Sequence, residues 1–294
     1  MSDHRLTCHS IALPLRGFLD GAHSSAGTVL GSSSAAVYLA LGDAVVALTA
    51  RSVPLMPNGA TVVENEGLDA FESGAGVRLS AAGVRGGRVE VVWDRAGLVD
   101  LSVPDNQGYD ARDVARKGRE LLGAMGHDSD PITAIADARP ELVAGEGFDG
   151  VRLLLAALRD EQPEAAADAA RVLTGRGPGL TPDGDDLLAA AAAAMIAFER
   201  PAGLNRKVAR ELRSALLVHD LGERTGALSV TLLRSAARGQ VIDPVRALLD
   251  LSVERATWMG ALGRLERIGH GTGGTYALGC ALGALALAGS YRRN

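Results

Sequence analysis

The segment GRGPGLTPDGDD, residues 175–186, is the most strongly constrained stretch of this 294-residue chain, and it leads directly into an Ala-rich apolar run at 187–198. Its glycines and prolines restrict the backbone to a tight, irregular loop. Thr181 or Asp183 can cap a helix that begins there, and three carboxylates crowd the first turn of that helix. We therefore expect a loop that opens onto a buried helix and aims backbone amides and acidic oxygens at a ligand.

A second glycine-rich turn, GHGTGG at residues 269–274, precedes another apolar run at 276–288. Both runs are apolar or small on all sides, which is typical of helices buried on every face. Gly279 and Gly283 are four residues apart in the second run and form a stripe that lets another helix approach closely. We expect the two helices to lie side by side with their N-termini at the same end, so that the two loops converge on one pocket.

Converging helix N-termini favour an anionic ligand, because their free N–H groups sum their partial positive charges. Thr225 and Ser229 lie four residues apart in RTGALS (224–229), so a helix would place their hydroxyls on one face. The candidate residues for binding phosphate or carboxylate are Arg176, Gly177, Gly179, Thr181, Thr225, Ser229, Thr272 and Gly273. Glycine-rich turns also serve as helix caps and packing points, and that alternative stays open.

The acidic residues of the first loop are the candidates for chemistry. Asp185 and Asp186 are predicted to be catalytic, together with His270 as a donor or general acid. Asp183, Asp185 and Asp186 could also hold a hard cation such as Mg²⁺, which prefers oxygen ligands. Carboxylates in a first helical turn also complement the helix dipole, and this alternative needs no ligand.

Composition narrows the possible partners and compartment. The net charge is −5, and no Lys/Arg run stands out, which disfavours nucleic acid and anionic membranes as partners. Cys8 and Cys280 lie far apart and suggest neither a disulfide framework nor a thiolate metal site. The apolar runs fall short of the about 20 residues of a membrane span, and the N-terminus lacks an export signal pattern. We expect a cytoplasmic protein.

The two halves of the chain differ in their patterns of apolar residues. Short apolar segments at 29–41, 44–48, 77–79, 89–93 and 98–103, separated by Gly, Asn and Pro, predict a barrel or sandwich-like β domain. Helical patterns follow at 111–125, 149–160, 163–173, 184–199, 205–219, 225–238, 243–254, 256–267 and 273–288. The predicted class is α+β, with a β-rich, barrel-like domain at 1–104 and a larger all-α domain at 105–294 that contains the two buried central helices.

Three motifs carry a family resemblance. GPGLTPDGDD (177–186), RTGALS (224–229) and IGHGTGGTYALGCALG (268–283) resemble the AllH-like family, which includes the AllH subunit of oxamate carbamoyltransferase. The N-terminal half is similar more loosely, through HSS (23–25) and VPLMPNG (53–59). Family members have Ser at the position of Asp183, and a His-Thr-Ser-Gly turn where this chain has residues 270–273. The additional carboxylate at Asp183 favours a bound cation.

The resemblance implies a function in the purine nitrogen catabolism that starts from allantoin. It implies a subunit that acts with two partner subunits, one of them similar to acyl-CoA synthetases. Together they would interconvert oxalurate plus phosphate with oxamate plus carbamoyl phosphate. All these substrates are small anions, and positioned donors rather than a covalent nucleophile would stabilise the charge that develops.

Two other functions stay open. One is a non-catalytic scaffolding subunit of a multi-subunit complex, or of a homo-oligomer, in which the glycine loops are packing devices. The other is a stand-alone metal-dependent hydrolase with its metal in the 183–186 cluster.

Overall fold

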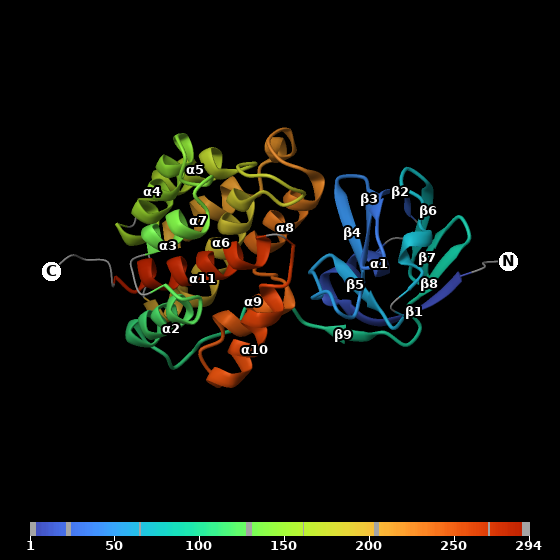
Figure 1. The fold of residues 1–294 in the computed structure, drawn as a ribbon, viewed down its shortest axis with the longest axis horizontal. Helices are drawn as coiled ribbons and strands as arrows, with labels where there is room; N and C mark the ends of the chain where they lie inside the picture. Colours follow the sequence, from blue (N-terminus) through green and yellow to red (C-terminus); the bar gives the residue numbers. More distant parts are fainter. Residues whose placement is uncertain are drawn as a thin grey trace. The chain divides into compact units, whose positions relative to one another are not determined.

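The structure is a computed structural model that describes residues 4–21, 25–64, 66–127, 131–160, 162–202, 206–269 and 271–289 (Figure 1). The chain divides into two compact units, Met1–Leu101 and Ser102–Asn294. The first unit is built mainly of strands and the second of helices. The predicted α+β class, with a β-barrel followed by an all-helical region, is therefore confirmed.

Eight strands of the described residues close into a barrel, because β1 pairs with β8 on one side and with β5 on the other. A further strand, β9, pairs with the end of β1 beyond an irregularity between Cys8 and Ser10. The strands are β1 (His4–Ala12), β2 (Ser25–Ser32), β3 (Ala36–Leu41), β4 (Ala44–Ala50), β5 (Gly59–Val62), β6 (Gly76–Ser80), β7 (Gly83–Gly86), β8 (Val89–Val92) and β9 (Gly97–Val99).

Alternation of side chains along the strands fills the barrel interior. In β3, Val37 and Leu39 are fully buried, and Leu48 of β4 joins them. The small α-helix α1 (Leu13–Gly21) adds Leu15 and Leu19 to the same core. The β unit therefore has its own hydrophobic core.

The strand predictions need several corrections. The run 29–41 is not one strand but the antiparallel pair β2 and β3. The turn at Gly86-Gly87 does join two strands, but the first of them is β7, which the sequence did not predict. Strands β1 and β5 and helix α1 were also missed, because their short, mixed sequences lack a clear period of two.

The helical unit follows the predicted pattern closely. Each predicted helical segment overlaps an observed helix, whereas α3 was not predicted. The helices are α2 (Ala111–Ala124), α3 (Pro131–Ala138), α4 (Glu146–Arg159), α5 (Pro163–Leu173), α6 (Asp183–Ala202), α7 (Arg206–Ala215), α8 (Ala227–Ala237), α9 (Asp243–Leu249), α10 (Arg255–Leu265) and α11 (Thr272–Leu287), with a 3₁₀ helix at His219–Glu223. No helix of the described residues has both the length and the apolar character needed to cross a membrane.

Helices α6 and α11 form the centre of the helical unit (Figure 1). Almost every residue of both helices is buried, as the all-round apolar pattern predicted. A Cβ added at Gly279 would lie 2.6 Å from the Cβ of Ala190, and one added at Gly283 would lie 2.6 Å from the Cβ of Ala194. The predicted small-residue stripe therefore brings these two backbones into close contact.

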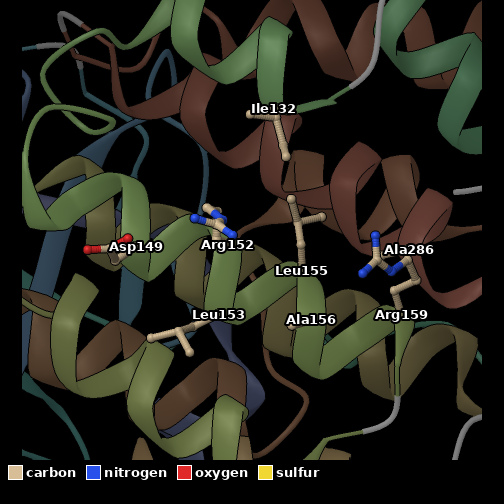
Figure 2. A pocket seen from close by; sticks show the side chains of 8 residues that line it. All are labelled: Ile132, Asp149, Arg152, Leu153, Leu155, Ala156, Arg159 and Ala286. Carbon is tan, nitrogen blue, oxygen red and sulfur yellow. The ribbon is translucent and has the colours of Figure 1, made fainter.

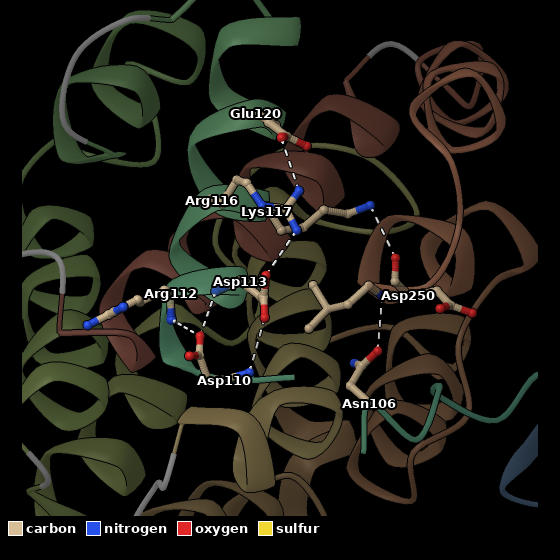
Figure 3. A network of polar contacts seen from close by, with 9 residues as sticks. Asn106, Asp110, Arg112, Asp113, Arg116, Lys117, Glu120 and Asp250 are labelled. Carbon is tan, nitrogen blue, oxygen red and sulfur yellow. Dashed lines mark hydrogen bonds and ion pairs between the residues drawn. The ribbon is translucent and has the colours of Figure 1, made fainter. Parts of the chain in front are cut away.

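A buried polar network ties α2 to the neighbouring loops (Figure 3). The Lys117 ammonium of α2 donates to the backbone carbonyl of Asp250 at 3.2 Å and lies 4.7 Å from the ring centre of Trp258. The Asn106 amide donates to two backbone carbonyls, of Ala197 and Leu249, each at 3.0 Å. Burial lowers the pKa of Lys117 to about 8, because water no longer solvates the ammonium.

Candidate functional site

Helices α6 and α11 run parallel, with their N-termini at the same end. Gly279 packs against Ala190 and, one turn later in both helices, Gly283 packs against Ala194. At the start of the helices the Thr181 and Thr272 hydroxyl oxygens are 3.1 Å apart. The two glycine-rich loops therefore meet, as expected from the sequence, and we call this region the loop junction (residues 175–186 and 271–275).

Asp186 lies in the first turn of α6 and is almost fully buried, with 1% of its surface exposed. Its Oδ2 atom has no hydrogen-bond partner among the described residues, and the nearby Thr181 and Thr272 hydroxyls act to lower its pKa. Burial raises the pKa of Asp186 well above its usual range, and the nearby charges of Asp183 and Asp185 raise it further. The carboxyl group therefore favours its protonated form, which can donate a hydrogen bond or a proton.

Asp185 is also buried, but both of its oxygens have partners. Oδ1 accepts the Gly175 N–H at 2.8 Å, and Oδ2 accepts the Thr225 hydroxyl. The Ser229 hydroxyl donates to the Leu180 carbonyl at 3.4 Å. Burial raises the pKa of Asp185, while Thr225, Gly175 and Ser229 act to lower it. The hydroxyls of Thr225 and Ser229 thus both act on Asp185. Thr225 lies two residues before the start of α8, so the two residues do not share one face of a helix as predicted. The arrangement fixes the first loop against the start of α8.

Asp183 connects α6 to α11. Its Oδ1 atom accepts the Thr275 hydroxyl at 2.8 Å and lies 3.3 Å from Nε of Arg139. Burial raises the pKa of Asp183, while the Thr275 hydroxyl and the Arg139 guanidinium lower it, and the negative charge of the neighbouring Glu141 raises it further. The sequence favoured a bound cation beside the additional carboxylate of Asp183. In the structure, the positive charge next to this carboxylate comes from the chain itself, from the guanidinium of Arg139.

Arg139 is the main residue of the junction that sequence reasoning missed. Besides its contact with Asp183, Nε donates to the Thr275 hydroxyl at 2.7 Å, and the guanidinium donates to the Gly271 carbonyl. Arg139 follows the unpredicted helix α3 and belongs to none of the motifs. Thr275 and the buried Tyr276 were missed too, although they lie only two and three residues after the predicted Gly273, and a hydroxyl inside an apolar run is a usable signal.

Two of the predicted anion-binding glycines have packing reasons in this structure. A Cβ at Gly273 would lie 1.7 Å from the Leu265 carbonyl oxygen, and the Gly273 N–H already donates to the Ile268 carbonyl at 3.3 Å. Gly177 has a φ of +109°, and a Cβ there would lie 2.8 Å from the Asp183 nitrogen. Gly179, by contrast, is exposed, with open space where a Cβ would stand.

Arg176 has its side-chain partners outside the loop junction. The Arg176 guanidinium forms an ion pair with Glu146, and its Nε donates to the Val172 carbonyl at 3.3 Å, so its charge is engaged with α4 and α5. His270 lies outside the described residues.

The predicted carboxylate cluster is not arranged as a metal site. No group of three or more His, Cys, Asp or Glu side chains is placed to hold a metal ion in the part of the chain that the structure describes. Asp183 faces α11 and Asp185 faces α8, because residues of one helical turn project in different directions.

A cavity of about 600 Å³ lies elsewhere in the helical unit (Figure 2). Ile132 of α3 and Leu155 of α4 point toward one another across it, and Arg152 and Arg159 line it together with Ala286 of α11. None of its lining residues belongs to the loop junction. The unpartnered carboxyl oxygen of Asp186 therefore lies outside this cavity.

The fold and the site define an α+β protein whose two parallel central helices bring their N-terminal loops together over a buried carboxyl group. Residues 173–284 match the model of the family described as oxamate carbamoyltransferase subunit AllH. The match includes both loops, α6, α8 and most of α11, and it confirms the resemblance carried by the three motifs. The family description names a subunit, which implies a multi-subunit complex. No curated protein and no solved structure matches the chain.

Proposed function

We propose that this chain is a subunit of a carbamoyltransferase-type enzyme, similar to oxamate carbamoyltransferase, and that it binds a small anionic substrate at the loop junction. The family match to residues 173–284 supports the class of enzyme. The observation that carries the proposal is Asp186, a buried carboxyl group with an oxygen that has no partner among the described residues. Buried polar atoms in proteins are nearly always hydrogen-bonded, so an exception of this kind suits a group that acts on a substrate.

Several features of the junction suit an anion such as phosphate, carbamoyl phosphate or oxalurate. The parallel N-termini of α6 and α11 place two positive dipole ends side by side. The hydroxyls of Thr181 and Thr272 lie 3.1 Å apart and near enough to Asp186 to affect its pKa. Arg139, which is paired with Asp183, offsets the negative charge of that carboxylate at the start of α11. A protonated Asp186 adds a donor and no negative charge.

The reaction requires that the leaving nitrogen be protonated. When a phosphate oxygen attacks the carbamoyl carbon of oxalurate, the bond from that carbon to the oxamate nitrogen breaks, and the nitrogen takes up a proton. Asp186 in its protonated form can deliver that proton, and the resulting carboxylate can recover one from the phosphate. General acid–base catalysis of this kind contributes about 10²–10⁴-fold to a rate. Asp185 and Asp183 hold the two loops in place as positioning residues.

The test is Asp186→Asn in the assembly reconstituted with its partner subunits. We expect kcat to fall by about 100-fold or more, because Asn cannot give up a proton, while the complex still assembles. The matched control is Asp168→Asn, which changes an exposed carboxylate of α5 paired with Arg171. Full turnover by the Asp186 variant would refute the proposal.

The scaffolding alternative draws support from the glycines. Gly177 and Gly273 are required by close backbone packing, so the loops can be explained without a ligand. A paired substitution, Thr181→Val with Thr272→Val, separates the two functions, because it removes two hydroxyls and leaves the packing volume unchanged. Loss of turnover in an intact complex supports the enzyme subunit. Unchanged turnover supports the scaffold.

A further inference from the structure

A row of charged side chains crosses four neighbouring strands of the barrel. Arg78 of β6 is paired with Arg85 of β7, Arg85 with Glu90 of β8, and Glu90 with Arg5 of β1. Residues directly opposite each other in a sheet share one face. Apart from His4 at the start of β1, the neighbours of these residues along each strand are buried, so the row lies on the outer face of the barrel. It contains three arginines and one glutamate.

The row is electrostatically uneven. Glu90 forms an ion pair with Arg85, and the charges of Arg85 and Arg5 lower its pKa. Arg78 stands directly opposite Arg85, and like charges in opposite positions destabilise a sheet. An anion placed against Arg78 and Arg85 would turn this repulsion into attraction.

The row faces a cavity of about 650 Å³. Four arginines and two carboxylates line it, which leaves the lining with a net charge of +2 in a chain whose net charge is −5. Two of these arginines form ion pairs within the lining or beside it, Arg16 with Asp20 at 2.9 Å and Arg85 with Glu90. Trp93 closes one wall and is fixed by donating its indole N–H to the Ser80 carbonyl at 3.0 Å. The volume is that of a small-molecule site, for which about 300–1,000 Å³ is usual.

We propose that this cavity on the outer face of the barrel is a second binding site, for a phosphorylated small molecule with at least two negative charges. Guanidinium groups recognise phosphate through paired, charge-assisted hydrogen bonds, and adjacent arginines suit adjacent phosphate oxygens. A long nucleic acid fits poorly, because the acidic remainder of the chain would repel it. The site lies in Met1–Leu101, outside the family match, and its existence does not depend on the function of the loop junction.

Inorganic pyrophosphate is the probe, titrated into the full chain by calorimetry at low ionic strength. We expect binding that weakens about tenfold in Arg85→Gln and in Arg78→Gln, since each removes a charge-assisted contact. Glu90→Gln should bind more tightly, because it removes a negative charge from the row. Arg85→Lys should fall between wild type and Arg85→Gln. The control is Arg51→Gln, an exposed arginine of the same unit that does not line the cavity.

The outcomes separate this site from the loop junction. Pyrophosphate binding that survives Arg78→Gln and Arg85→Gln but is lost in the paired Thr181/Thr272 variant would overturn the proposal. No binding at millimolar pyrophosphate, or capture of a polyglutamate peptide without pyrophosphate binding, would overturn it as well. The arginine variants change exposed side chains, and the Glu90 and paired threonine variants change half-buried ones without altering their volume, so circular dichroism should show an unchanged fold.

Discussion

The Asp186 carboxyl is buried beside two other carboxylates, and this arrangement opposes folding at neutral pH. The folded state raises its pKa, so the folded chain holds a proton that the unfolded chain would release. Stability linked to this group is therefore greatest below its unfolded pKa, near 3.8, and is lost as the pH rises through the folded pKa. A natural sequence that keeps such a group gives up stability where function needs it.

We predict that Asp186→Asn raises the free energy of unfolding at pH 7 by about 1–2 kcal/mol. The neutral amide fills the same space and needs no proton to be buried. Chemical denaturation of both proteins from pH 7 down to pH 4.5 measures the effect. The gain should shrink as the pH falls; a variant that is less stable at pH 7 and unchanged at pH 4.5 would contradict this account.

Lys117 gives the opposite dependence on pH. Its pKa falls from 10.5 to about 8 on folding, so the stability linked to it is present above pH 10.5 and is lost as the pH falls through 8. Lys117→Met keeps the buried stem and removes the charge. We predict that wild type gains stability relative to this variant between pH 8 and 10.5. Urea titrations at intervals across that window test it, with Lys207→Met of α7 as the control.

At the scale of elements, the close packing of α6 against α11 depends on small residues, glycine and alanine. The glycines of α11 meet alanines of α6 at spacings of four residues, so the parallel alignment and the position of the loop junction are set together. This part of the site could be predicted, because the small-residue stripe and the all-round apolar pattern are local features of the sequence. The strands of the β unit were predicted less well, because their pairing is non-local and their sequences are short.

We predict that Gly283→Ala destabilises the chain by about 1–3 kcal/mol, since its new Cβ would stand 2.6 Å from that of Ala194. Ala194→Gly should cost about 1 kcal/mol by itself, through helix propensity. In the double variant the methyl group has moved from α6 to α11, so the interface contains the same number of methyl groups as before. The loss of stability in the double variant should therefore be smaller than the sum of the losses in the two single variants. A strictly additive result in a double-mutant cycle would show that this contact is not tight.

At the scale of the whole molecule, the chain consists of two units, each with its own core. The barrel core runs from Leu6 to Trp93 within the first unit, and α6 and α11 form the core of the second. A closed barrel has no free edge, so the first unit needs no strand from elsewhere to complete its sheet. The proposed second binding site and the loop junction therefore belong to two units with separate cores.

We predict that the two units unfold in separable steps. Leu48→Ala empties part of the barrel core and should cost about 2–5 kcal/mol, because Leu48 is fully buried there. It should lower the midpoint temperature of the calorimetric transition of the β unit and leave that of the helical unit unchanged. Gly283→Ala should lower the midpoint temperature of the helical unit alone. A single transition that both variants shift equally would show that the units unfold as one.

The amino-acid sequence by itself determined the α+β class, the two apolar helices and the meeting of their loops, because hydrophobic periodicity and small-residue spacing act over a few turns of chain. Only the tertiary structure decided which polar groups find partners. Arg139 reaches Asp183, Thr225 reaches Asp185, and Asp186 keeps an oxygen without a partner among the described residues. These outcomes depend on contacts between residues tens of positions apart, and no local pattern encodes which donor arrives at which acceptor.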